Sequence, residues 1–192
     1  MNEATYLDQL ATLQAAAWPA GTPREAQYPH GRQPLSEYLR AWARLQPDAP
    51  ALDFYGHGLN YAELDRLSDR CAALFTELGV RPGDRIALFM PNCPQLHIAF
   101  YAILKCGAVY APVSPLSKGL ELSYQLKDSD TRIVLCFDQL LPVVRAVREE
   151  MRGHVAVPVG VRLDHGHESA GAAPQRRDVG GEDLRVGDLC AQ

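Results

Sequence analysis

The stretch that decides the fold is residues 79–137, which read GVRPGDRIALFMPNCPQLHIAFYAILKCGAVYAPVSPLSKGLELSYQLKDSDTRIVLCF. Short apolar runs at 86–90, 108–113 and 132–137 alternate with longer segments whose apolar residues recur every three or four positions. Such unbroken runs are typical of strands buried on both faces, and the periodic segments between them predict helices. Helical connections make parallel pairing the short solution. The stretch therefore predicts a doubly wound, mostly parallel α/β sheet with helices on both faces.

The ends of the predicted helices carry capping signals. Asn60 and Glu63 have the spacing of a capping box, in which each side chain accepts a hydrogen bond from the other residue's backbone N–H. Asn92 is predicted to cap the helix after the first strand, with Pro94 in its first turn, and Ser117 to cap the next helix. Asn92 also follows the carboxyl end of a strand, where doubly wound sheets bind ligands, so a ligand contact stays open as a second interpretation.

The same alternation continues on both sides of this stretch. The further predicted elements are helices at 3–17, 35–45, 61–78 and 139–151, a β-hairpin at 49–61 that turns at Gly56-His57-Gly58, and a strand at 155–161. Changes in composition predict four parts: an N-terminal arm at 1–34, the α/β part at 35–163, a flexible linker or loop at 164–181, and the start of a further strand at 182–192.

Composition and charge narrow the class of protein. A chain of 192 residues with 47% hydrophobic and 22% charged residues suits one globular domain. A net charge of −4 disfavours nucleic acid as a partner, because phosphate binding usually shows as a basic excess. The sequence has no apolar run long enough to cross a bilayer, and its first residues lack a secretory signal, so we expect a cytoplasmic protein.

The five cysteines favour neither a metal site nor a disulfide. They are scattered, without a C-x-x-C pair or a His at finger spacing: Cys71, Cys93, Cys106, Cys136 and Cys190. Cys71, Cys106 and Cys136 have apolar neighbours, and a thiol in such a setting behaves as a small hydrophobe.

Several short pieces also follow one another in a fixed order. They are LSEYL at 35–39, LNYAEL at 59–64, GVRPGDRIA at 79–87, MPN at 90–92, AILKCGAVY at 102–110, ELSYQLKDS at 121–129 and DL at 188–189. In this order they resemble the N-terminal part of the AMP-forming acid–CoA ligases, members of the adenylate-forming enzyme superfamily. The piece SPL at 114–116, followed by EL at 121–122, is more similar to acyl- or aryl-CoA ligases than to the adenylation modules of peptide synthetases.

The resemblance implies an enzyme that joins a carboxylic acid to ATP, releasing pyrophosphate, and then passes the acyl group to the thiol of coenzyme A. It implies Mg²⁺ beside the triphosphate. It also implies a phosphate loop ending in Lys, an acidic metal ligand, a ribose-binding Asp and a mobile C-terminal domain with a catalytic Lys, all beyond Gln192. The sequence contains neither G-x-x-x-x-G-K nor G-x-G-x-x-G.

We therefore assign no catalytic, cofactor-binding or metal-binding residue within this chain. The expectation is an N-terminal fragment of a ligase, inactive alone, whose partners are a carboxylic acid, CoA and the missing C-terminal part. The alternative is a complete, non-catalytic α/β module that binds a small ligand or a partner protein.

Some polar groups have both a functional and an ordinary interpretation. His165, His167 and Glu168 have metal-ligand chemistry, and Asp164 with Glu168 could pair as acid and base, but all lie in the linker, so we expect a solvated loop. His97 lies beside an apolar helix face and is expected to be partly buried and hydrogen-bonded.

The remaining candidates are also expected to be ordinary. Arg176 and Arg177 could meet a CoA phosphate, but the flanking Asp178 is more typical of solvated surface. Tyr101 and Tyr110 are expected in the core or in the wall of a crevice.

Overall fold

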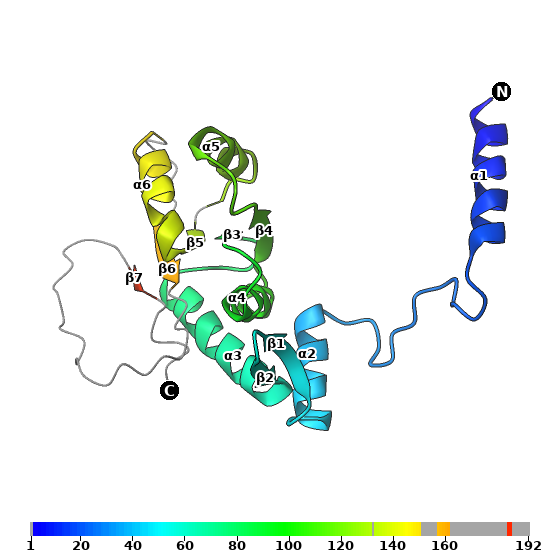
Figure 1. Cartoon of the computed structure of the whole chain (residues 1–192), viewed down its shortest axis with the longest axis horizontal. Helices are drawn as coiled ribbons and strands as arrows, with labels where there is room; N and C mark the ends of the chain where they lie inside the picture. The colour runs from blue at the N-terminus through cyan, green and yellow to red at the C-terminus, as the bar shows by residue number, and fades with distance from the viewer. Residues whose placement is uncertain (1, 132, 151–156, 162–183, 186–192) are drawn as a thin grey trace. The chain divides into compact units, whose positions relative to one another are not determined.

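The chain divides into two units in the computed structural model, which describes residues 2–131, 133–150, 157–161 and 184–185 (Figure 1). The first unit, residues 1–32, contains helix α1 (Glu3–Ala17), which confirms the helix predicted there. The Asn2 side chain caps this helix by accepting a hydrogen bond from the Thr5 N–H at 2.9 Å. No residue of α1 is buried.

The second unit, residues 33–192, begins with helix α2 (Leu35–Leu45) and a β-hairpin of strands β1 (Pro50–Phe54) and β2 (His57–Asn60). The hairpin was predicted correctly, but the turn predicted at Gly56-His57-Gly58 is wrong. The turn is Tyr55-Gly56, with φ of 51° and 82°, and His57 already pairs with Phe54. Two successive positive φ values match the right-handed twist of the flanking strands, so two residues suffice.

Helix α3 (Tyr61–Glu77) follows the hairpin without a break. The predicted capping box is confirmed: the Glu63 N–H donates to Asn60 Oδ1 at 2.8 Å, and the Asn60 N–H donates to Glu63 Oε2 at 3.0 Å. Gly79, with a φ of 80°, ends the helix as predicted, because it adopts the left-handed conformation without a steric cost.

A five-stranded parallel sheet forms the rest of the unit. Its strands are β3 (Arg85–Phe89), β4 (Val109–Val113), β5 (Ile133–Phe137), β6 (Val157–Val161) and β7 (Leu184–Arg185). They lie in the order β4-β3-β5-β6-β7, and every neighbouring pair is parallel. The connecting helices are α4 (Pro94–Lys105), α5 (Gly119–Asp128) and α6 (Leu141–Glu150). The predicted fold class is confirmed.

Each central strand is buried on both faces because its residues alternate between two cores. On one face Ile86, Leu88 and Leu135 pack with residues of α3 and α4. On the other face Phe89 and Val134 pack with residues of α5 and α6. Figure 1 shows the strands between these two pairs of helices. This explains why the strands read as continuous apolar runs in the sequence.

The predicted starts of α5 and α6 are wrong by one and two residues, respectively. The N-cap of α5 is Lys118, and the Glu121 carboxylate accepts its N–H at 3.1 Å, so Ser117 does not cap this helix. The Ser117 N–H instead donates to the Ser114 carbonyl at 2.9 Å, within the preceding turn. A short 3₁₀ turn, Asp138–Leu140, precedes α6, which therefore begins at Leu141.

The Gly107 position predicts a measurable backbone effect. Gly107 has a φ of 68°, and a Cβ added there would lie 3.3 Å from the Cβ of Pro82. Replacing Gly107 by alanine is therefore expected to lower the free energy of unfolding by about 2 kcal/mol, through backbone strain and this close contact. Gly79→Ala is the matched control, because Gly79 also ends a helix at positive φ but has nothing within 4 Å of the added Cβ. Urea unfolding that gives equal losses for both variants would contradict the role of the Pro82 contact.

None of the helices in the described part of the chain is long and apolar enough to cross a bilayer. The four-part division at 1–34, 35–163, 164–181 and 182–192 stays a prediction, since most of its last two parts lies outside the described residues.

Candidate functional site

The candidate site follows from the order of the parallel strands. Strand β3 has its successor β4 on one side and β5 on the other, so the direction of chain travel reverses between β3 and β5. The helix after β3 packs on one face of the sheet and the helix after β5 packs on the opposite face. Doubly wound sheets bind ligands at such a reversal, beyond the carboxyl ends of the strands. We call residues 90–93 and 138–140 the switch-point edge.

The segment that leaves β3 places one buried and one exposed polar residue at this edge. Asn92 is exposed, whereas Cys93 is fully buried. The N-cap of α4 is Cys93, so the prediction that Asn92 caps this helix is wrong. Pro94 does occupy the first helical turn, as predicted. Asn92 therefore lies one residue outside the helix with its side chain accessible, and its interpretation as a ligand contact stays a prediction.

Cys93 is held in an inert form. Burial raises the pKa of its thiol above the ordinary value, and the nearby backbone N–H groups of Leu96 and Gln95 offset part of that rise. Because the thiolate is the nucleophilic form, a buried thiol with a raised pKa is a structural residue rather than a catalytic one.

This environment predicts a loss of stability at alkaline pH. The unfolded thiol ionises near its ordinary pKa of 9.0, while the folded thiol keeps its proton to higher pH. Above about pH 9 the folded state therefore binds more protons than the unfolded state, and the free energy of unfolding falls by up to about 1.4 kcal/mol per pH unit for this group. Burial also raises the pKa of Cys106 and Tyr101, which add to the fall.

Urea unfolding of wild type and Cys93→Ala at several pH values from 8 to 10 measures the Cys93 contribution. We expect a shallower decline for Cys93→Ala, whatever the variant loses in absolute stability. An identical pH slope for the two proteins would show that Cys93 does not titrate differently on folding.

His97 and Gln95 lie in the first turns of α4, next to the edge. The His97 ring Nδ1 lies 3.1 Å from the Cys93 carbonyl oxygen, and the residue is half-buried, which confirms the expected hydrogen-bonded histidine. The Gln95 side-chain oxygen is buried and, among the described residues, has no hydrogen-bond donor. A buried acceptor without a donor costs about 1–3 kcal/mol of stability. No sequence pattern indicated Gln95.

The segment that leaves β5 adds exposed polar groups. Asp138 and Gln139 are exposed, whereas Leu140 is half-buried and packs against the core that includes Val144. Within the described ranges no group of three His, Cys, Asp or Glu side chains could hold a metal ion.

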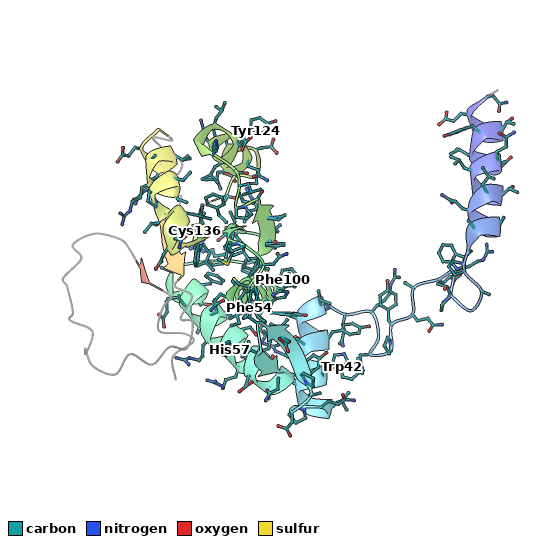
Figure 2. The ribbon with its side chains drawn as sticks, viewed as in Figure 1. Trp42, Phe54, His57, Phe100, Tyr124 and Cys136 are labelled. Atoms are coloured by element: carbon teal, nitrogen blue, oxygen red, sulfur yellow. The ribbon has the colours of Figure 1, made fainter. Side chains whose placement is uncertain are left out.

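The aromatic candidates belong to the core rather than to the edge. Tyr101 and Tyr110 are half-buried, and both rings meet the ring of Phe100 edge-on, with centroids 5.3 and 5.2 Å away. Figure 2 labels Phe100 among the side chains of this unit. Burial, together with the nearby Tyr61, raises the pKa of the Tyr101 phenol. These contacts agree with the expected core or crevice-wall role.

The other sequence candidates lie outside the described residues. They are Asp164, His165, His167, Glu168, Arg176, Arg177 and Cys190. Of the cysteines expected in apolar surroundings, Cys71 and Cys136 are buried and Cys106 is half-buried.

The largest polar feature that sequence reasoning missed is an ion-pair cluster at the other end of α4. It consists of Glu37, Arg40, Asp65, Asp69 and Lys105. The Lys105 side chain is 2% exposed, and its Nζ donates to Asp65 Oδ1 at 2.6 Å, the Asp65 carbonyl at 2.9 Å and Asp69 Oδ1 at 2.7 Å. Arg40 Nη2 lies 3.6 Å from the same Asp69 oxygen, and Arg40 also pairs with Glu37. The cluster joins α2, α3 and α4 and is structural.

Comparison with known proteins gives consistent matches. The family model described as "AMP-binding enzyme" matches residues 39–184. The long-chain-fatty-acid–CoA ligase of Bacillus subtilis is 33% identical over 127 residues, which are 66% of this chain and 22% of that protein. The salicyl-AMP ligase / salicyl-S-ArCP synthetase of Mycobacterium tuberculosis is 42% identical over 91 residues, covering 47% of this chain and 16% of that protein.

A solved structure agrees with these sequence matches. The N-terminal domain of FACL13 from Mycobacterium tuberculosis superposes with a TM-score of 0.62 and 30% identity, covering 80% of this chain and 41% of that one. The chain thus spans about a fifth of the length of the curated relatives it matches.

Proposed function

Since the chain belongs to the AMP-binding enzyme family, we propose that it forms the N-terminal part of an ATP-dependent, AMP-forming carboxylic acid–CoA ligase. The match to the family model over residues 39–184 carries this proposal. In such a ligase ATP activates the acid as an acyl-adenylate with release of pyrophosphate, and the thiol of CoA then takes the acyl group. The similar proteins are named for long-chain fatty acid and salicylate, so we propose an acid with an apolar alkyl or aryl body.

The chain's own residues contribute a scaffold. The two cores fix strands β3 and β5, and these strands fix the switch-point edge. At that edge we assign Asn92, which is exposed, to contacts with polar groups of the substrates. We propose that adenylation requires the part of the ligases that this chain does not span, because the match covers 22% of the Bacillus subtilis ligase.

A pyrophosphate-release assay tests the proposal in two arms. The 192-residue chain, given ATP, Mg²⁺ and a panel of fatty and aromatic acids, is expected to show no turnover above background. A chimera is the second arm: the matching region of the Bacillus subtilis ligase is replaced by this chain's aligned residues, with the unmodified ligase as the positive control. We expect acid-dependent pyrophosphate release from the chimera, reduced by Asn92→Ala.

The two arms have separate failures. Robust turnover by the chain alone would defeat the claim that it needs a remaining part. A folded chimera that releases no pyrophosphate with any acid would count against the ligase assignment itself.

A further inference from the structure

Strand β4 lies at one edge of the parallel sheet. Within the described ranges it pairs with β3 alone (Figure 1). The outer side of an edge strand presents backbone N–H and C=O groups that can pair with a strand of another molecule. The five residues of β4 carry no charged side chain that would oppose such pairing. The backbone chemistry of this edge therefore decides whether a second copy of the chain can add a strand to the sheet.

One hydrogen bond identifies which backbone groups of β4 face outward. The Val109 N–H donates to the carbonyl of Asp84, the residue before β3, at 2.8 Å. The backbone groups of Val109 therefore face β3. Because successive residues of a strand direct their N–H and C=O groups to opposite sides, those of Ala111 also face β3. The backbone groups of Tyr110 and Pro112 consequently face away from the sheet, toward the open edge.

Both outward groups of Pro112 are lost to an incoming strand. Proline has no N–H, and within sheets it is confined to places such as an edge strand whose missing donor would face solvent. The Gln125 side-chain amide of α5 donates to the Pro112 carbonyl at 3.1 Å, so the acceptor is already occupied. The N–H and carbonyl of Tyr110 are then the outward groups that remain. A single residue cannot form a ladder, which needs donors and acceptors on alternate residues.

We propose that Pro112 and Gln125 together close the β4 edge, so that a second copy of the chain cannot pair with it. The two features are independent, since one is a property of the strand and the other is supplied by a neighbouring helix. Gln125 is itself exposed, but Leu122 and Leu126 of the same helix are buried against the sheet and hold α5 beside the strand. The inference concerns self-association and does not depend on the proposed ligase function.

The variant Pro112→Val/Gln125→Ala tests the proposal, because it restores the missing donor and frees the occupied carbonyl. Sedimentation velocity over a range of protein concentrations is expected to show dimers that form about tenfold more tightly than any formed by the wild type. Amide hydrogen exchange reports whether the edge is the contact. The Tyr110 N–H should exchange rapidly in the wild type at every concentration, and it should become protected in the double variant as the concentration rises.

Gln14→Ala is the control, because it removes the same amide group from an exposed position of α1, and it should sediment as the wild type does. Pro112 and Gln125 are both exposed, so the double variant should fold, which urea unfolding checks. The proposal is overturned if the folded double variant dimerises within twofold of the wild type. It is also overturned, without any variant, if the Tyr110 N–H of the wild type becomes protected as the concentration rises.

Discussion

Replacing Asp65 and Asp69 together by alanine is expected to lower the free energy of unfolding by about 3 kcal/mol. Both carboxylates bind the ammonium of Lys105, whose side chain is 2% exposed. Without these carboxylates, the Lys105 ammonium keeps only the Asp65 backbone carbonyl among its described partners. A buried charge that has lost its counter-ions strongly destabilises the folded state. Urea unfolding at pH 7 measures the loss.

Replacing Lys105 should lower the free energy of unfolding by less than replacing the two aspartates does. Lys105→Met keeps the apolar stem and removes the charge, while Asp65 and Asp69 are 22% and 52% exposed and can be hydrated. We expect a loss of about 1 kcal/mol or less, and a recovery of most of the lost stability in Asp65→Ala/Asp69→Ala/Lys105→Met. A larger loss for Lys105→Met than for the aspartate pair would mean that the cluster contributes net stability and not merely compensation for a buried charge.

The ion-pair cluster is an example of a contact that could not be predicted from the sequence. Asp65 and Lys105 are 40 residues apart, and nothing in either helix identifies the other as its partner. By contrast, the capping box of Asn60 and Glu63 is local, with both hydrogen bonds spanning three residues, so its spacing alone predicted it. Local chemistry can be predicted from sequence, while a pair that forms when two helices pack depends on the tertiary fold.

The helix starts illustrate a second limit. Asn92 and Cys93 are adjacent, and residue preference favours the asparagine as a cap, yet α4 starts after Cys93 because that residue is drawn into the core. Burial of one side chain thus shifted the boundary by one position. At α5 the reason is different: Lys118 is exposed, and the carboxylate of Glu121 accepts its backbone N–H, so the helix starts after Lys118 rather than after Ser117.

The sequence predicted that a site would lie at the carboxyl edge of the sheet, but it did not predict which residues lie there. Apolar runs separated by helices imply parallel strands, and parallel strands imply one edge at which all carboxyl ends meet. Which loops meet there depends on the strand order, and the reversal between β3 and β5 is a tertiary fact. The unpartnered oxygen of Gln95 arises from packing around α4, so no spacing in the sequence could indicate it.

Val134→Ala and Leu135→Ala should each lower the free energy of unfolding by about 2–4 kcal/mol, with the larger loss for Leu135. The two residues are neighbours on β5, and their side chains point to opposite faces of the sheet. Val134 is fully buried in the core with α5 and α6, and Leu135 is 1% exposed in the core with α3 and α4. Truncating either one leaves a cavity in a different core.

The pair tests the double winding directly, because a sheet covered on one face would tolerate one of the two substitutions. Val109→Ala is the matched control: it removes the same two methyl groups as Val134→Ala, but from an edge strand where the side chain is 49% exposed. We expect it to cost under about 1 kcal/mol in the same urea experiment. A loss at Val134 no larger than that at Val109 would mean that α5 and α6 do not cover the sheet in solution.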